Sequence, residues 1–365
     1  MTTVTDLETG LYRVPNEEAL EDATQSFDAL ELVVASVTTD DGHSGLGFTY
    51  TIGDGGATIR EFLESTLRED VVGAGAAPRA ARERLLADTT FVGREGISEL
   101  AIAAVDVALW DRLGRALDAP LYELLGGERR SVPAYQTDGG WLQYDTEALV
   151  ENAATAASRG FAGMKMKVGR GHAEDAARIA AVREALPPEM DLMIDGNCSY
   201  SVPEARRLAD RIDVPVDWFE EPLPKGDYTG HADLRDRIDV PVALGENLYS
   251  ERQFTQVLAT GAADVLQPDV CRVGGVSPWM TVAEMADAWG LPVSPHYVEP
   301  LHVHLAAAVP NVPYVEHHST VLDGVMTEPP ELADGGLRPP SAPGHGIEFD
   351  GLEAYRVAGG IDVID

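Results

Sequence analysis

The chain has 365 residues, 44% of them hydrophobic, so it can bury the core of one large α/β barrel or of two ordinary domains. Its 61 Asp and Glu residues face only 27 Lys and Arg residues, and the resulting formal net charge of −34 excludes DNA, RNA and anionic membranes as partners. The chain also lacks the run of about 18 apolar residues that a membrane-spanning helix needs.

Lysine is nearly absent from this acidic chain, because Lys165, Lys167 and Lys225 are the only three. Dispersed acids with little lysine favour a cytoplasm at very high salt, where salt screens the repulsion between carboxylates. The alternative, a cation store, would gather its acids in one block.

The first 15 residues lack the basic and apolar runs of a leader, so we expect a cytoplasmic protein. We also expect the protein to be a homo-oligomer.

The first part of the chain, residues 1–127, is predicted to be an α+β domain. An antiparallel ribbon is expected over residues 30–37 and 45–50, joined by a turn at Asp40-Asp41-Gly42-His43. Apolar residues at helical spacing then predict helices over 56–69, 78–88 and 97–115.

From residue 128 to residue 325 a short apolar run, a loop and a helical pattern repeat, which is the rhythm of βαβ units. The expected strands are Val132–Gln136, Met164–Val168, Leu192–Asp195, Asp217–Glu220, Val242–Glu246, Val265–Asp269, Val293–His296 and Tyr314–Glu316. Seven or eight such units predict a TIM-type (β/α) barrel. Residues 326–365 are expected to return and pack on the N-terminal domain.

The predicted strands from the second to the eighth all end in titratable residues, and strand ends of a barrel share one mouth. With 61 acids in the chain, one carboxylate at a strand end means little, so the joint pattern carries the argument. Asp195, Glu220 and Glu246 end consecutive strands, where three carboxylates stay ionised only if a cation neutralises them. Oxygen ligands without Cys or His favour Mg²⁺, with Mn²⁺ as the second choice.

Two further groups of strand ends suggest acid–base chemistry. Lys165 and Lys167 lie two residues apart on one strand and therefore point the same way, into the mouth. Two adjacent ammonium groups disfavour each other's charge, so one of them is a candidate general base. Asp269 and His296 end neighbouring strands, and a carboxylate that orients an imidazole is a common acid–base pair.

Together these residues resemble the enolase superfamily and, within it, the mandelate racemase group, over almost the whole chain. The most specific motifs are Lys-x-Lys at 165–167, Met193-Ile194-Asp195-Gly196-Asn197, Trp218-Phe219-Glu220-Glu221-Pro222, Leu244-Gly245-Glu246-Asn247, Gln267-Pro268-Asp269 with Gly274-Gly275, and Ser294-Pro295-His296. The resemblance implies that residues 1–127 are a capping domain over a barrel, completed by the C-terminal segment.

The resemblance also implies a role for each residue. Asp195, Glu220 and Glu246 become the Mg²⁺ ligands, Lys167 the base on one face of the substrate, and Lys165 its partner at the carboxylate. Asp269 and His296 become the acid–base dyad on the other face, and Glu316 a hydrogen-bond partner of the developing enolate. Asn197, Asn247 and Tyr50 are then expected to contact substrate.

Such a site removes the proton next to a carboxylate, so the expected ligand is a small-molecule carboxylate. By analogy we expect dehydration of a sugar acid, an aldonate or aldarate, to a 2-keto-3-deoxy acid. The alternatives are racemisation or epimerisation of a 2-hydroxy acid and, in another class, a non-catalytic metal- or ligand-binding barrel.

Cycloisomerisation normally accompanies a lysine on the sixth strand in this family, and this chain has Asp269 and Arg272 there instead, which disfavours that activity. The predicted pocket loops, 11–28 and 49–56, look polar and suit a polyol, although Trp141 and Tyr144 weaken that inference.

Overall fold

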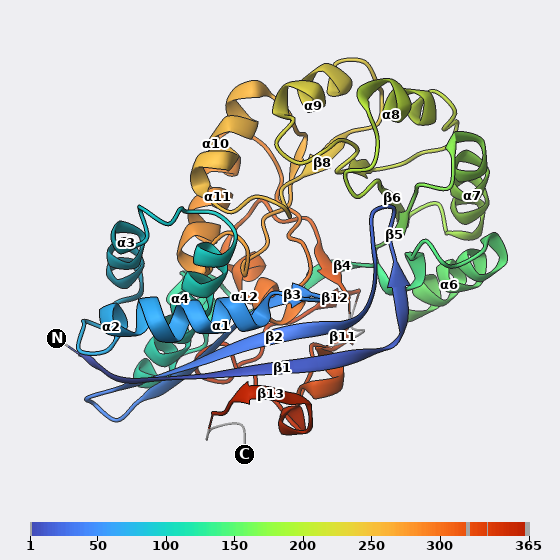
Figure 1. Ribbon diagram of the computed structural model, residues 1–365. Helices are drawn as coiled ribbons and strands as arrows, with labels where there is room; N and C mark the ends of the chain where they lie inside the picture. The colour runs from blue at the N-terminus through green and yellow to red at the C-terminus, as the bar shows by residue number, and fades with distance from the viewer. Residues whose placement is uncertain (1, 319–321, 334, 362–365) are drawn as a thin grey trace.

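A computed structural model of the protein describes residues 2–318, 322–333 and 335–361. A four-stranded antiparallel sheet with its helices lies beside a ring of parallel strands that is surrounded by further helices (Figure 1). The expected fold class, an α/β barrel of the (β/α)7-8 type with an N-terminal α+β capping domain, is confirmed. Within the described ranges, every helix is too short or too polar to cross a membrane.

The N-terminal sheet has the strand order β13-β1-β2-β3. Its strands are β1 (Val4–Glu21), β2 (Ser26–Thr39), β3 (Ser44–Ile52) and β13 (Arg356–Gly359). The helical segments beside it are α1 (Gly56–Phe62), a π-helix (Leu63–Leu67), α2 (Arg68–Val71), α3 (Pro78–Asp88), α4 (Ile97–Leu117) and α5 (Leu121–Leu124). The expected ribbon and helices are therefore present, and β1 is an additional long strand where no strand was predicted.

Helix α4 lies directly on strand β3 because that strand contains glycine at the contact. A Cβ atom on Gly47 would come within 2.1 Å of the carbonyl oxygen of Ala104, and one on Gly45 within 2.2 Å of that of Ala108. Small residues on both elements thus let two backbones approach. This contact fixes the sheet, and with it the pocket-facing end of β3, against the rest of the molecule.

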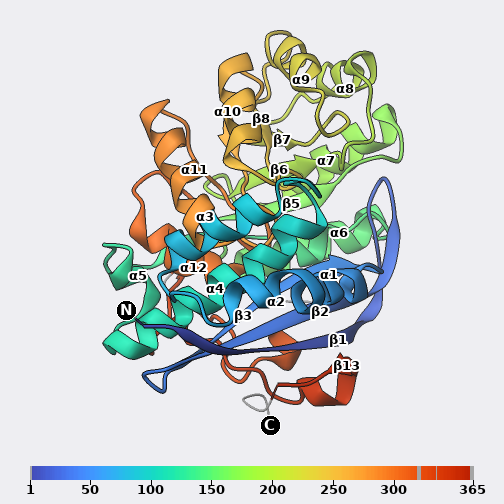
Figure 2. The ribbon, with the colours of Figure 1, turned by 60° about the vertical axis from the view of Figure 1, so that its left-hand side comes forward.

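The barrel strands are β4 (Val132–Gln136), β5 (Gly163–Lys167), β6 (Asp191–Asp195), β7 (Trp218–Glu220), β8 (Val242–Leu244), β9 (Val265–Leu266) and β10 (Val315–His317). The helices around them are α6 (Thr146–Arg159), α7 (His172–Ala185), α8 (Val202–Ala209), α9 (Tyr228–Arg235), α10 (Glu251–Thr260), α11 (Val276–Ala288) and α12 (Glu299–Ala308). Strands β4 to β9 pair in sequence order, and β10 returns to pair with β4. Figure 2 shows the helices following one another around the strands.

The inside of the barrel changes from apolar to charged along the strands. Tyr135, Met193, Trp218, Ala243 and Val265 form a buried apolar cluster. Because side chains alternate along a strand, the residues two positions after Met193 and Trp218 also point inward. Those residues are the carboxylates expected at the strand ends, so the apolar cluster forms the floor beneath them.

The seventh predicted strand, Val293–His296, differs most. Two others are shorter than predicted, because β8 ends at Leu244 and β9 at Leu266, before Glu246 and Asp269. Val293 makes a single parallel bridge with Leu266, and residues 294–296 have no strand pairing in the described structure. Pro295 has no N–H group to donate to a neighbouring strand, which accounts for the break. The segment still brings His296 to the mouth of the barrel.

Two segments connect the N-terminal sheet to the barrel. The turn between β1 and β2 rises beside β5 and β6 (Figure 1), and the N–H of Leu142 donates to the carbonyl of Glu21 at 2.9 Å. The C-terminal segment pairs β13 with β1, while β12 (Gly336–Leu337) pairs with both β4 and β11 (Leu332–Ala333). The limits 1–127, 128–325 and 326–365 remain predictions.

Candidate active site

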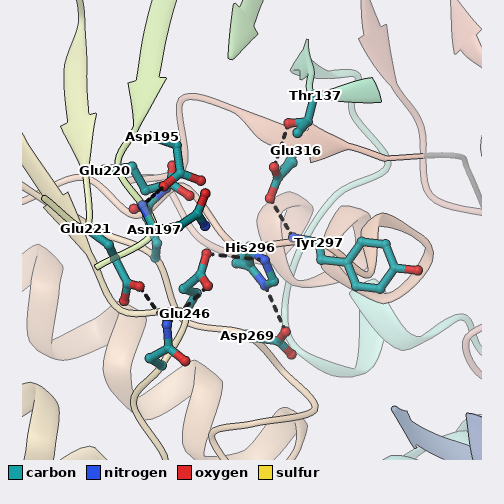
Figure 3. A network of polar contacts seen from close by, with 12 residues as sticks. Thr137, Asp195, Asn197, Glu220, Glu221, Glu246, Asp269, His296, Tyr297 and Glu316 are labelled. Atoms are coloured by element: carbon teal, nitrogen blue, oxygen red, sulfur yellow. Dashed lines mark hydrogen bonds and ion pairs between the residues drawn. The ribbon is translucent and has the colours of Figure 1, made fainter. Parts of the chain in front are cut away.

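Three buried carboxylates meet at the ends of neighbouring barrel strands. Asp195 and Glu220 are paired in register, and with Glu246 they offer ligand atoms that all lie within 4.8 Å of one another. Figure 3 shows the three side chains converging on one space. The predicted metal ligands are therefore close enough to share one ion, and their oxygen-only donor set suits a hard divalent cation.

The protein itself leaves negative charge to be neutralised at this point. Glu220 accepts hydrogen bonds from Gln267 Nε2 at 2.6 Å and Trp218 Nε1 at 3.1 Å. Burial raises the pKa of Glu220 to about 8; Lys165 opposes this rise, and the charges of Asp195, Glu316 and Glu246 add to it. Such crowding is what a bound cation relieves.

Lys165 and Lys167 are both buried but have different surroundings. Lys165 Nζ lies 2.6 Å from Glu220 Oε1 and 2.7 Å from Glu316 Oε1, and its side chain is only 1% exposed. Lys167 Nζ lies 2.5 Å from Asp195 Oδ2, lines the main cavity, and sits over the ring of Trp141 at 5.0 Å. Of the two, Lys167 is thus the lysine that a ligand in the cavity can reach.

The lysine pKa values differ from the sequence-based expectation. Burial lowers the pKa of Lys167 and so does Lys165, but Asp195 raises it by more, so the net direction is upward. For Lys165 the net direction is also upward, because Glu220 and Glu316 outweigh burial. At each lysine the neighbouring carboxylates outweigh the other ammonium group, so repulsion between the two lysines does not lower either pKa below its usual value.

His296 lies between two carboxylates, as Figure 3 shows. Its Nδ1 is 3.0 Å from Asp269 Oδ2 and its Nε2 is 3.3 Å from Glu246 Oε2. Burial lowers the pKa of His296, but Glu246 and the hydrogen bond with Asp269 raise it by more, so the net pKa is about 9. At neutral pH the imidazole therefore carries a proton that it can donate.

Glu316 is held as an acceptor. Thr137 Oγ1 donates to its Oε1 at 2.6 Å, and the N–H of Tyr297 donates to its Oε2 at 2.8 Å. Although burial raises the pKa of Glu316, Lys165 and His296 lower it by more. An ionised carboxylate can only accept hydrogen bonds, so donation from Glu316 to an enolate stays a prediction that this arrangement does not by itself support.

The three expected substrate contacts occupy different positions, although all of them line the cavity. Asn197 Oδ1 has no hydrogen-bond partner within the described ranges and can receive a ligand hydroxyl. Asn247 is engaged, because its Nδ2 donates to Glu221 Oε2 at 2.6 Å and its Oδ1 accepts from Arg272. The Tyr50 hydroxyl donates to Asp269 Oδ2 at 2.5 Å and therefore contacts the dyad.

Sequence reasoning missed three residues that position these groups. Thr137 and Tyr297 hold Glu316, and Gln267 holds Glu220. Thr137 directly follows the first predicted strand, so the strand-end rule that found the acids would have found it as well. Tyr297 acts through its backbone N–H, which no side-chain pattern reveals.

Adding Mg²⁺ is expected to raise the thermal midpoint of unfolding, because the triad exists only in the folded state. A ligand at a hundredfold excess over its Kd stabilises the folded state by about 2.7 kcal/mol, which corresponds to a rise of several degrees. Differential scanning calorimetry with EDTA and with Mg²⁺ measures the shift. It should disappear in Asp195→Asn and persist in Asp239→Asn, which changes an exposed acid outside the site. An equal shift in both variants would place the ion elsewhere.

The two parts of the chain match two known sequence families. Residues 8–126 match the mandelate racemase/muconate lactonizing enzyme N-terminal domain, and residues 148–354 match the enolase C-terminal domain-like family. Together the two matches cover most of the chain.

Individual proteins resemble the chain over nearly its whole length. The chain is 35% identical to an L-talarate/galactarate dehydratase of Salmonella typhimurium, over 94% of this chain and 86% of that protein. It is 36% identical to a 3,6-anhydro-alpha-L-galactonate cycloisomerase of Streptomyces coelicolor, over 96% of this chain and 98% of that protein. Among solved structures, an L-talarate dehydratase from Polaromonas sp. JS666, complexed with Mg and L-glucarate, superposes with a TM-score of 0.93 at 34% identity, covering 99% of both chains.

Proposed function

The chain belongs to the mandelate racemase/muconate lactonizing enzyme group of the enolase superfamily, and on that premise we propose that it is a Mg²⁺-dependent sugar-acid dehydratase. It removes the proton next to the carboxylate of an aldonate or aldarate and eliminates water to give a 2-keto-3-deoxy acid. One observation carries the proposal. Lys167 and His296, from the second and seventh barrel units, line one cavity together with Glu246, one of the three predicted metal ligands. Relatives named as dehydratases support it.

Lys167 is the proposed base for the α-proton, a role that requires its neutral form. A divalent cation held by Asp195 would offset the attraction that raises the pKa of Lys167. Its Nζ faces the cavity, whereas Lys165 is enclosed by Glu220 and Glu316. Asp195, Glu220 and Glu246 would hold Mg²⁺, which would stabilise the negative charge that develops on the substrate carboxylate oxygens. Lys165 adds a fixed positive charge at the same side, and Glu316 keeps it in place.

His296 is the proposed acid for the departing hydroxyl. It is protonated at neutral pH, and Asp269 fixes the ring by accepting from Nδ1. Nε2, which lies 3.3 Å from Glu246 Oε2, would serve the substrate once Glu246 holds the cation. Protonating the hydroxyl at C3 as it leaves avoids the release of hydroxide. Tyr50, which donates to the same oxygen of Asp269, fixes that carboxylate in turn.

The cycloisomerase relative widens the range of leaving groups without changing this chemistry. A 3,6-anhydro sugar acid carries at C3 a ring oxygen in place of a hydroxyl, so proton removal at C2 and C–O cleavage at C3 would open a ring and release no water. A pair such as Lys167 and His296 can supply both proton transfers. The sequence argument disfavoured cycloisomerisation because the sixth strand has no lysine, but ring opening by this route does not need one.

The test is a panel of aldonates, aldarates and 2-hydroxy acids incubated with the Mg²⁺-loaded protein in D₂O at high KCl. Dehydration predicts 2-keto acid formation together with deuterium exchange at C2. Exchange without keto acid would identify a racemase or epimerase, the second candidate. If no member showed exchange or keto acid, the barrel would be a binding protein and the catalytic proposal would fail.

A further inference from the structure

The cavity that Lys167 and His296 line, of about 380 Å³, has one apolar wall. The N-terminal sheet contributes Leu20, Phe27, Leu30 and Ile52 to its lining, and Trp141 joins them by stacking edge-on against Phe27 at 5.6 Å. The expectation that residues 11–28 and 49–56 form loops was wrong, because most of both segments is strand. Leu20, Phe27 and Ile52 of these segments line the cavity, beside the polar residues Asp22, Thr24, Gln25 and Tyr50.

The polar residues of the same wall are already engaged. Asp22 Oδ1 accepts from the N–H and the hydroxyl of Thr24, both at 2.7 Å, and from the N–H of Gln25. Asp22 Oδ2 accepts from Gln25 Nε2 at 3.2 Å, and the Tyr50 hydroxyl is used by Asp269. This side of the cavity therefore offers few hydrogen bonds to the far end of a sugar acid.

The charges around the cavity also disfavour a second carboxylate on the ligand. Asp22 is only 6% exposed and places a negative group in the wall. Arg272 Nη1 donates to Asn247 Oδ1 at 2.8 Å and to the carbonyl oxygen of Glu246 at 3.3 Å, and His318 pairs with Asp138 at 3.0 Å. Lys225 lines the mouth but is exposed, where a single ion pair contributes little.

From the apolar wall and the buried Asp22 we infer that the substrate is a monocarboxylic sugar acid whose distal end is apolar, a deoxy or anhydro aldonate in preference to an aldarate. This inference rests on the proposed function only in taking the ligand to be a sugar acid. The catalytic groups hold the carboxylate end, Asn197 Oδ1 is free for a hydroxyl near the metal ligands, and the methyl or ring carbons of the other end pack on Leu20, Phe27, Leu30 and Ile52.

The experiment measures binding, so that its result is separate from turnover. Dissociation constants are determined by calorimetry for three six-carbon acids that share the configuration at C2 to C5 and whose C6 is a methyl, hydroxymethyl or carboxylate carbon. The host is the full Mg²⁺-loaded chain with Lys167→Ala, which does not consume the ligand. We expect the methyl acid to bind most tightly, with a dissociation constant about fourfold below that of the hydroxymethyl acid for its one buried methyl group. The dicarboxylate should bind at least about tenfold more weakly than the methyl acid.

Three further substitutions in the same host assign the effect. Ile52→Thr keeps the branched shape and should bring the methyl and hydroxymethyl acids to within about twofold of each other. Ile97→Thr is the matched control at a surface position outside the cavity and should leave the order unchanged. Asp22→Asn keeps the turn that Oδ1 forms and should improve binding of the dicarboxylate alone.

Several outcomes overturn the inference. The dicarboxylate could bind as tightly as the methyl acid, and a loss of that affinity in Lys225→Gln would then assign its distal carboxylate to Lys225. Failure of all three acids to bind would also overturn it. If the wild-type protein turns over none of the acids but the binding order holds, the proposed function fails and the inference stands.

Discussion

Replacing Lys167 with alanine is expected to abolish both deuterium exchange at C2 and keto acid formation. General acid–base groups contribute about a hundredfold to ten-thousandfold to rate, so kcat should fall by at least the lower figure. Of the two lysines on β5, Lys167 lines the cavity, whereas Lys165 is enclosed and cannot take its place. Exchange measured by NMR with Mg²⁺ present tests this directly.

The control for Lys167→Ala has to separate lost chemistry from lost structure. Removing the lysine leaves Asp195 without its partner at 2.5 Å, and an unpaired buried charge is destabilising. The variant is therefore compared in saturating Mg²⁺, with its unfolding midpoint recorded beside that of Arg207→Ala, which removes an exposed cation. Full exchange in Lys167→Ala would assign the base elsewhere.

The barrel and its strand-end residues were predictable because their signals are local. Each strand is a short apolar run followed by a polar residue, and parallel strands in sequence order bring those residues together. The strand-end pattern predicts that Asp195, Glu220 and Glu246 share one site, and their ligand atoms are within reach of one ion. Helices such as α3, which matches the predicted limits 78–88, carry equally local signals.

Strand β1 was not predictable in the same way. Its 18 residues include Pro15, Glu17 and Glu18, which are depleted in strands, so propensity and alternation both fail there. The strand forms because its neighbour β2 pairs with it over most of its length, a tertiary cause that the local sequence does not record. The apolar wall of the cavity was missed for the same reason.

The lysine pair shows a second kind of limit. Strand alternation correctly placed both side chains inside the barrel, and both are buried. Whether two buried ammonium groups stay charged depends on which carboxylates lie closest, and those come from strands β6, β7 and β10. Electrostatic balance of this kind needs distances between strands, which spacing along one strand does not give. In the same way, the sequence does not show which of the two lysines a substrate can reach; the structure does, because Lys167 lines the cavity and Lys165 does not.

Replacing His296 with asparagine is expected to abolish dehydration, with a loss of at least about a hundredfold in keto acid formation. The asparagine can retain a hydrogen bond with Asp269 but has no proton to give to a departing hydroxyl. Because Lys167 remains, deuterium exchange at C2 should continue for substrates whose α-proton faces the lysine. The two activities, measured on one sample, should therefore separate.

This separation is what distinguishes a two-sided site from one in which a single group does both steps. If His296→Asn kept full dehydration on every substrate, the acid on the second face would be wrongly assigned. If it lost exchange and dehydration together while Mg²⁺ still raised its unfolding midpoint, His296 would be the base and Lys167 an electrostatic partner of Asp195. His43→Asn, which changes an exposed histidine in the β2–β3 turn, should retain both activities, because His43 lies outside the cavity and its loss changes no group that a substrate contacts.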